Sequence, residues 1–257
     1  MLNLWTPAVI KVYDALGGQV RLVGGCVRDY LMDKKPNDID MATPLPPDEV
    51  RQRLSEHSIK SHPISPRHGL TEIIMDGERF EITTLRKDSY VGGRQKITFI
   101  ADYATDGMRR DFTMNALSMD REQIYDYFGG RRDIQAKVVR FIGEPSMRIS
   151  EDPLRIFRYI RFWANFGRDE PDTDIIALFP KYRDGLAGVS LSRRKKEFAK
   201  IIMGKRAILA IDIMRKSGLL PFIVARDGVD DFKKLLSLNS TCSIEERLHC
   251  FNNYIQQ

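Results

Sequence analysis

The chain has 257 residues, of which 42% are hydrophobic and 30% charged, and its formal net charge is +6. This length can bury one large core or two smaller ones, and 18 glycines and 12 prolines argue against a low-complexity or disordered chain. The pI near 9.2 favours a polyanionic partner such as nucleic acid, although composition alone leaves that inference at roughly even odds.

The cysteines and the N-terminus bear on the cellular compartment. The three cysteines, Cys26, Cys242 and Cys250, are odd in number and have no metal-ligand spacing, which favours a reducing cytosol over a disulfide framework. Residues 1–10 lack the basic start and apolar core of a signal peptide, and no run of about 18 apolar residues is present. We expect a cytoplasmic protein with no membrane partner, and the sequence does not indicate an oligomeric state.

The first half of the chain alternates strand-like and helix-like segments. The predicted elements, in chain order, are a strand over 20–23, a helix over 26–32, a strand over 39–43, an amphipathic helix over 48–57, and strands over 70–75, 79–85 and 98–103. Asp76-Gly77 is a strong hairpin signal between two of these strands. The polar segment 89–96, which contains Gly92-Gly93, is predicted to be a mobile loop.

Beyond about residue 140 the pattern becomes helical and rich in arginine and lysine. Ser150 is the expected N-cap of a helix that tolerates Pro153 in its first turn. Further helices are predicted over 193–203, 207–217 and 230–236. An α/β head is therefore expected to precede a helical extension.

Asp38 and Asp40 form the first candidate site. Side chains alternate along a strand, so both carboxylates point to one face while Ile39 points into the core. Two carboxylates at this spacing can hold Mg²⁺ while phosphates complete its shell. Taken alone, such a pair is a solvated strand end in roughly three cases of four.

The Gly24-Gly25 turn, which precedes the acidic pair, bears on the choice between a metal site and a solvated strand end. Two glycines between a strand and a helix let backbone N–H groups approach a phosphate closely, and Arg28 can add a charge-assisted contact. A bare glycine pair is more often only a turn. A phosphate cradle shortly before an acidic pair favours a metal–nucleotide site.

A third pattern concerns base selection. On a helix, Asp152, Arg155, Arg158 and Arg161 step by about 60° and form a slowly winding polar stripe. A carboxylate accepts from the amino group of cytosine or adenine, and a guanidinium donates to the ring nitrogen, whereas uracil and guanine present the opposite polarity. Asp152 with Arg155 would then admit CTP and ATP. An arginine-rich helix face is usually just solvated. Asp152, a hydrogen-bond acceptor in a row of arginine donors, argues against that interpretation here.

Several motifs occur in order from about Arg21 to Phe162. They are Gly24-Gly25-x-Val27-Arg28-Asp29, Asp38-x-Asp40-x-x-Thr43, the segment 79–86, Arg109-Arg110-Asp111-Phe112-Thr113-x-Asn115-Ala116, Asp126-x-Phe128-Gly129-Gly130, and Glu151-Asp152-x-x-Arg155-x-x-Arg158-x-x-Arg161-Phe162. Together they resemble the tRNA CCA-adding and bacterial poly(A) polymerase family of polymerase β-type nucleotidyltransferases. The resemblance implies an α+β fold, with a nucleotidyltransferase head of mixed β-sheet and flanking helices over 1–140 and an all-α neck and body over 141–257.

The resemblance also implies roles for individual residues. Arg110 would contact the triphosphate or ribose, and Asp111 and Asn115, four apart on an expected helix, would lie near the ribose hydroxyls. An N-cap carboxylate and a helix-surface amide remain the alternative for this pair, at roughly one chance in three. Glu81 is the candidate third acidic group, because the strand after Asp76-Gly77 could bring it near Asp38 and Asp40.

The implied activity is template-independent addition of C and A from CTP and ATP to the 3′ end of tRNA by two-metal catalysis with Mg²⁺. The basic run 193–196 would follow the RNA backbone, although a solvated helix face explains it almost as well. CC-only, A-only and poly(A) addition share these motifs, and segment 89–96, at the position of the family's flexible loop, mildly favours complete CCA addition. Family members continue further than Gln257, which keeps a noncatalytic tRNA-binding module open, along with the tRNA preference and whether the chain is truncated or naturally minimal.

Overall fold

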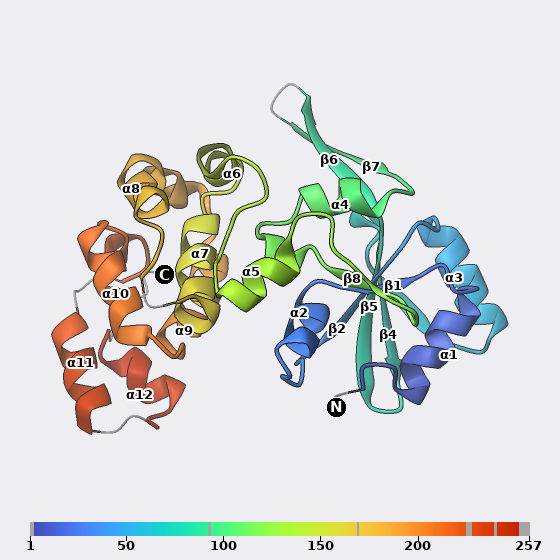
Figure 1. The fold of residues 1–257 in the computed structure, drawn as a ribbon, viewed down its shortest axis with the longest axis horizontal. Helices are drawn as coiled ribbons and strands as arrows, with labels where there is room; N and C mark the ends of the chain where they lie inside the picture. The colour runs from blue at the N-terminus through green and yellow to red at the C-terminus, as the bar shows by residue number, and fades with distance from the viewer. Residues whose placement is uncertain (1–2, 92–93, 169, 225–227, 239–240, 252–257) are drawn as a thin grey trace. The chain divides into compact units, whose positions relative to one another are not determined.

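The computed structural model describes residues 3–91, 94–168, 170–224, 228–238 and 241–251. The chain divides into two compact units, Met1–Gln135 and Ala136–Gln257. The first unit contains the sheets, and the second is built mainly from helices (Figure 1).

The first unit is organised around a seven-stranded mixed sheet with the order β3-β4-β5-β2-β1-β8-β9. Its strands are β1 Arg21–Val23, β2 Ile39–Thr43, β3 Ser61–Ser65, β4 Leu70–Met75, β5 Glu78–Thr84, β8 Ser118–Met119 and β9 Ile124–Tyr125. β2 and β5 are parallel, whereas the other neighbouring strands are antiparallel. This arrangement confirms the predicted α+β class with a mixed sheet.

Helices cover one face of this sheet. α1 Pro7–Ala15, α2 Gly25–Leu31 and α3 Pro47–Glu56 contribute buried side chains to a single core with the strands. Along β5, Phe80 and Ile82 are buried in that core, whereas Arg79 and Glu81 alternate with them and stay more exposed. The opposite face carries a smaller apolar cluster of Val23, Ala42 and Leu85, and polar side chains such as Glu81 lie on the same face.

The predicted loop over 89–96 is wrong. β6 Arg86–Val91 and β7 Arg94–Phe99 pair as a two-stranded antiparallel hairpin beside α4 Tyr103–Met108, and Gly92-Gly93 lies outside the described residues (Figure 1). A hairpin paired only with itself needs no apolar face, so its strands lack the hydrophobic alternation that predicts a strand. The predicted strand over 98–103 also ends early, because the Asp102 side chain accepts from the N–H of Thr105 at 2.8 Å and caps α4.

The second unit is mainly helical. Its helices are α6 Pro145–Glu151, α7 Arg155–Phe166, α8 Thr173–Tyr182, α9 Leu191–Ile202, α10 Ala207–Lys216, α11 Val229–Leu238 and α12 Ile244–His249. α7 packs on α9 and α10, and their fully buried side chains include Phe157, Phe198 and Ile211.

The predicted helix start at Ser150 is wrong. Ser150 belongs to α6, Asp152 is the residue that ends α6, and α7 begins only at Arg155. Proline disfavours helical geometry in the residue before it, and Asp152, which precedes Pro153, has φ −145° and ψ 98°. Asp152 therefore lies between two helices and is not part of the α7 stripe.

Two expectations concern the compartment. Among the residues that the structure describes, no helix has the length and apolarity to cross a membrane. The three cysteines are free thiols, two of them buried.

The Asp126-x-Phe128-Gly129-Gly130 motif forms the start of α5 Gly130–Ala136. The two carboxylate oxygens of Asp126 accept from the N–H groups of Gly130 and Arg131 at 2.8 and 2.9 Å. A Cβ on Gly130 would lie 2.4 Å from the carbonyl oxygen of Thr113, so the close approach of two backbone segments requires glycine there.

Gly130→Ala is expected to lower the free energy of unfolding by about 1–3 kcal/mol, because backbone atoms cannot yield to the added methyl group as a side chain would. Urea unfolding followed by circular dichroism measures the change. The control is Gly188→Ala, at a glycine outside the left-handed region whose added Cβ would meet open space. Equal stability of the two variants would contradict the packing argument.

Candidate active site

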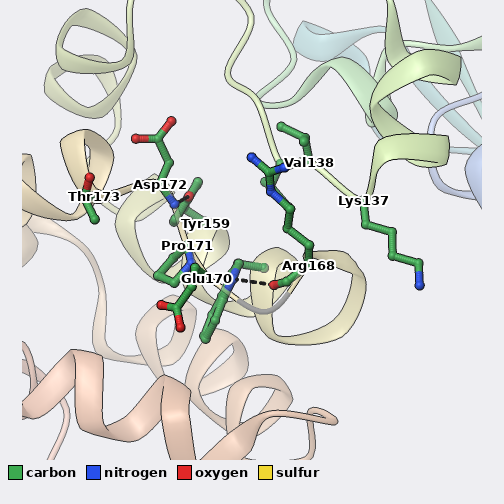
Figure 2. Close-up of a pocket in the computed structure, with 10 residues that line it drawn as sticks. Lys137, Val138, Tyr159, Arg168, Glu170, Pro171, Asp172 and Thr173 are labelled. Atoms are coloured by element: carbon green, nitrogen blue, oxygen red, sulfur yellow. Dashed lines mark hydrogen bonds between the residues drawn. The ribbon is translucent and has the colours of Figure 1, made fainter.

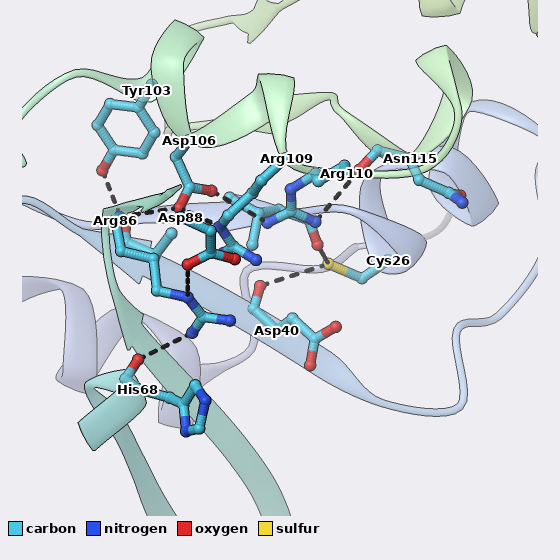
Figure 3. A network of polar contacts seen from close by, with 12 residues as sticks. Cys26, Asp40, His68, Arg86, Asp88, Tyr103, Asp106, Arg109, Arg110 and Asn115 are labelled. Carbon is cyan, nitrogen blue, oxygen red and sulfur yellow. Dashed lines mark hydrogen bonds and ion pairs between the residues drawn. The ribbon is translucent and has the colours of Figure 1, made fainter. Parts of the chain in front are cut away.

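The acidic pair lies at the start of β2. Asp40 is the second residue of the strand and is partly buried, whereas Asp38 precedes the strand in a bend and is exposed. Because Met41 is buried in the core, Asp40 points to the opposite face of the sheet, where Ala42 is covered by Tyr103 of α4. The sulfur of Cys26 lies 3.7 Å from the carbonyl oxygen of Asp40 and supports this part of β2 from α2 (Figure 3).

Glu81 lies beside Asp40. The two residues are register partners in the parallel pair β2–β5, so their side chains lie on the same face of the sheet. Arg79 pairs with Glu81 at 3.0 Å and with Glu72, the register partner of Glu81 on β4, at 2.5 Å. The structure thus brings Glu81 to the acidic pair, and its catalytic role stays a prediction.

The charges around Asp40 are unbalanced. Burial raises the pKa of the Asp40 carboxyl, and the negative charges of Glu81 and Asp38 raise it further, whereas Arg110 lowers it. Within the described residues no three or more His, Cys, Asp or Glu side chains form a metal-binding group. Two carboxylates with unneutralised charge fit a hard cation that takes its remaining ligands from phosphate and water, as Mg²⁺ does in nucleotide sites.

Asp40→Asn is expected to raise the urea midpoint of the protein at pH 7 without magnesium. The folded-state pKa of Asp40 lies above its unfolded value, so ionisation destabilises the fold at neutral pH, and this destabilisation disappears as the pH falls below the unfolded pKa of about 4. Urea midpoints of wild type and variant at pH 7 and pH 4 test the sign. Asp48→Asn, at a carboxylate that is 90% exposed, is the control. A lower midpoint for Asp40→Asn at pH 7 would refute this electrostatic account.

Arg110 is placed by a buried carboxylate that sequence reasoning missed. Asp106 on α4 is 2% exposed and accepts from Arg109 Nε at 2.9 Å and from the N–H of Arg86 at 3.0 Å, while Arg110 Nη2 lies 3.8 Å from its second oxygen (Figure 3). Arg110 also donates to the carbonyl oxygen of Asn115 at 3.2 Å. The sequence feature that could have revealed this contact is the position of Asp106, one helical turn before the Arg109-Arg110 pair.

Gly24 makes room for Arg110. A Cβ on Gly24 would lie 2.6 Å from Arg110 Nη1, and the glycine has a φ of +74°, which side chains rarely adopt. The Gly24-Gly25 turn predicted as a phosphate cradle therefore also brings the Arg110 guanidinium against the start of α2. Desolvation lowers the pKa of Arg110, while Asp106 and Asp40 oppose that effect.

Arg28, Asp111 and Asn115 form one hydrogen-bonded chain. Arg28 Nη1 donates to Asn115 Oδ1 at 2.7 Å, Asn115 Nδ2 donates to Asp111 Oδ1 at 2.9 Å, and Arg28 also pairs with Asp29 at 2.8 Å. The expected helix across Asp111 and Asn115 is wrong, because only a 3₁₀ turn, Thr113–Asn115, forms there. The two side chains still meet, and both are more than nine-tenths buried, so in this structure they hold Arg28.

The three arginines of α7 are paired with carboxylates. Arg155 Nη1 lies 2.7 Å from Glu151, and Arg161 and Arg158 lie 2.7 and 3.6 Å from Glu197 of α9, which is 6% exposed. Asp152 pairs with Arg193 of α9 at 2.9 Å. The expected basic run 193–196 is thus partly engaged within the protein, since Arg194 also donates to the carbonyl oxygen of Phe222.

Glu197→Ala is expected to cost about 3 kcal/mol of unfolding free energy, because it removes a buried carboxylate that neutralises two arginines. Chemical unfolding measures the loss. Lys200→Ala, at an exposed position of the same helix, is expected to stay within about 0.5 kcal/mol of wild type. A loss of that small size for Glu197→Ala would show that the pair is dispensable.

Each unit also contains a cavity that the sequence did not predict. One of about 400 Å³ adjoins Asp38 and is lined partly by Lys35, Asn37 and Arg79. The other, of about 340 Å³, lies in the second unit and is lined partly by Tyr159, Arg168 and Asp172 (Figure 2).

The aromatic groups of the second cavity are already engaged. Trp163 Nε1 donates to the carbonyl oxygen of Arg168 at 3.1 Å, and Tyr159 Oη accepts from the N–H of Asp172 at 3.1 Å. Burial raises the pKa of Tyr159 to about 12, so it remains a neutral phenol at physiological pH. The second cavity is lined by both cations and carboxylates. Its charges therefore favour neither an anionic nor a cationic ligand.

Comparison with known proteins identifies the class to which this fold belongs. Residues 20–140 match the family model "Poly A polymerase head domain", and residues 170–225 match "Probable RNA and SrmB- binding site of polymerase A". A solved structure of the Bacillus stearothermophilus CCA-adding enzyme in complex with CTP is similar with a TM-score of 0.74 and 30% identity, over 91% of this chain and 57% of that one.

Curated relatives make the assignment more specific. The CCA-adding enzyme of Staphylococcus epidermidis is 34% identical over 84% of this chain and 54% of its own length, and the human mitochondrial CCA tRNA nucleotidyltransferase 1 is 34% identical over 84% and 52%. The chain belongs to the family of tRNA CCA-adding enzymes and bacterial poly(A) polymerases. It spans about half the length of the curated relatives it matches.

Proposed function

We propose that this chain adds C and A nucleotides from CTP and ATP to the 3′ end of tRNA without a nucleic-acid template, with release of pyrophosphate. The observation that carries the proposal is the charged cluster around Asp40 on β2, which has Glu81 and Asp38 as acidic neighbours and Arg110 as a cationic neighbour. Carboxylates for a cation beside a guanidinium for phosphate match the needs of nucleotidyl transfer.

Residues of the first unit would bind and orient the reactants. Asp38 and Asp40 would hold Mg²⁺, which when bound supplies Lewis-acid chemistry at phosphate oxygens and at the attacking hydroxyl. Arg110 would contact the triphosphate from the position that Asp106 and the Asn115 carbonyl give it. Gly24 and Gly25 would let phosphate approach the backbone.

Other first-unit residues would act around this centre. Arg28 would add a charge to the phosphate site, and Asp111 and Asn115 would orient Arg28 and face the ribose. Glu81 would serve as a third acidic group beside Asp40. We assign this catalytic role to residues 1–140.

Residues 141–257 would select the base and bind RNA. Asp152 would accept from the amino group of cytosine or adenine, and Arg155 would donate to the ring nitrogen. Arg158 and Arg161, held by Glu197, would complete the nucleotide-binding helix. The basic residues of α9 would contribute to RNA binding, and the cytoplasmic location stays a prediction.

Poly(A) synthesis is the second candidate, because both matching family models are named after that polymerase. Partial addition of CC or A alone uses the same residues. A noncatalytic tRNA-binding module is the remaining alternative, motivated by the length of the relatives, and the intact set of Asp38, Asp40 and Arg110 argues against it.

The deciding assay incubates the chain with tRNAs that end before CCA, after CC and after complete CCA, each with labelled CTP or ATP. We expect CTP to be incorporated by the first tRNA, ATP by the second, and neither by the third. Long A tails on unrelated RNA would indicate poly(A) synthesis, and no label in any combination would favour the binding module.

Asp40→Ala is expected to abolish incorporation while leaving the Kd for tRNA nearly unchanged, because the carboxylate serves the reaction and not RNA binding. Filter binding and the labelled assay measure the two properties. Glu122→Ala, at an exposed carboxylate of the same unit, is expected to remain active. Activity retained by Asp40→Ala would remove the metal assignment.

A further inference from the structure

An arginine between tyrosine rings lies beside the start of α4. The guanidinium carbon of Arg21, the first residue of β1, is 4.1 Å from the ring centroid of Tyr103 and 3.5 Å from that of Tyr125. Arg21 Nη1 also donates to Tyr127 Oη at 3.2 Å. Tyr103 begins α4, whereas Tyr125 ends β9. Because a guanidinium is attracted to the faces of aromatic rings, Arg21 joins α4 to the strands β1 and β9.

Tyr103 also bonds to the strand that carries Asp40. Its hydroxyl donates to the carbonyl oxygen of Ala42 at 2.9 Å, two residues after Asp40 in β2. Ala42 is the register partner of Arg21 in the β1–β2 pair, so Tyr103 contacts two paired residues at once. Burial raises the pKa of Tyr103, which keeps its hydroxyl protonated and able to donate. The start of α4 is therefore fixed to β2 close to the acidic pair.

The other end of α4 leads into the arginine that neighbours Asp40. Asp106, one helical turn after Tyr103, lies 3.8 Å from Arg110 Nη2. Figure 3 shows Tyr103, Asp106 and Arg110 along this segment, beside the strand that carries Asp40. α4 has six residues and spans about 9 Å, so it moves as one rigid element. A shift of its first turn would therefore displace the Arg110 guanidinium.

The contacts of Arg21 suit positioning better than RNA binding. Arginine and aromatic rings also bind single-stranded RNA by stacking, and Tyr127 is 45% exposed. The Arg21 guanidinium, however, already lies against two tyrosine rings, and Tyr103 packs on a buried apolar cluster that contains Ala42. An RNA base would have to displace contacts that the fold already makes.

We propose that Arg21 and Tyr103 are positioning residues for nucleotidyl transfer, which hold α4 on β2 and thereby set the place of Arg110 beside Asp40. The inference rests on the proposed function, in which Arg110 contacts the triphosphate. The two residues act through Arg110, so their effect on triphosphate binding requires that side chain.

The test is a double-mutant cycle on the affinity for inorganic triphosphate, measured by calorimetry in the presence of Mg²⁺. Arg21→Ala and Tyr103→Phe are each made in wild type and in Arg110→Ala. The matched controls are Lys11→Ala and Tyr13→Phe on α1, which packs on the other face of the sheet. ATP addition to tRNA ending in CC gives kcat and KM, filter binding gives the Kd for tRNA, and thermal unfolding checks the fold.

Arg21→Ala is expected to weaken triphosphate binding about tenfold and to lower kcat, because a displaced guanidinium forfeits much of one charge-assisted contact. Tyr103→Phe is expected to lose about threefold, since it keeps the ring and removes one hydrogen bond. Neither substitution is expected to change the affinity further in Arg110→Ala. Arg21→Lys is expected to restore part of the affinity, because an ammonium also binds ring faces, and both α1 controls are expected to match wild type.

Four results would overturn the inference. They are wild-type triphosphate affinity in Arg21→Ala and Tyr103→Phe, no triphosphate binding by wild type, an equal loss with and without Arg110, and weaker tRNA binding by Arg21→Ala with triphosphate affinity unchanged. The last of these would assign the aromatic cluster to RNA. Tyr103→Phe keeps the ring, so it decides the question even where Arg21→Ala unfolds.

The binding measurement also separates the inference from the proposed function. A wild type that shows the Arg110-dependent coupling in triphosphate binding, but incorporates no nucleotide into any tRNA, supports the positioning role and refutes the proposed function alone.

Discussion

The parallel pairing of β2 with β5 is the constraint on which the site depends. It sets Asp40 directly beside Glu81, and Asp38 lies just before the same strand. Burial raises the pKa of the Asp40 carboxyl, and the like charges of Glu81 on the neighbouring strand and of Asp38 raise it further. A face that gathers negative charge in this way requires a cation from the protein, from a metal ion, or from both.

The protein supplies one such cation through several coupled contacts. The Arg110 guanidinium can approach the start of α2 because Gly24 has no side chain. Asp106 and the carbonyl oxygen of Asn115 both hold it there. Asp106 also accepts from the backbone N–H of Arg86, where the β6–β7 hairpin begins. The same buried carboxylate thus anchors both the hairpin and the guanidinium nearest the acidic cluster.

The sequence predicted those parts of the fold that bury an apolar face. The strands over 39–43 and 70–75 and the helix beginning near Pro47 have the periodicity that packing against a core imposes. The β6–β7 hairpin and β3 Ser61–Ser65 were missed or misassigned, because none of the described residues of these strands is buried in a core that would impose the periodicity. Asp152 was misplaced for a different reason, since the restriction from Pro153 outweighs the helical spacing.

The sequence suggested candidate residues for the site but not the side chains that hold them. Asp38, Asp40 and Arg110 stand in compact motifs, whereas Arg193 and Glu197 reach α7 and Asp152 from a helix far along the chain, a distance that no periodicity encodes. These contacts also change the interpretation of the basic run 193–196 in α9. A run of cations is usually a solvated or RNA-binding face, but here Arg193 pairs with Asp152 and the buried Glu197 pairs with Arg161. The charges predicted to read a base are therefore fixed by the fold before a nucleotide arrives, which lowers the ordering cost of recognition.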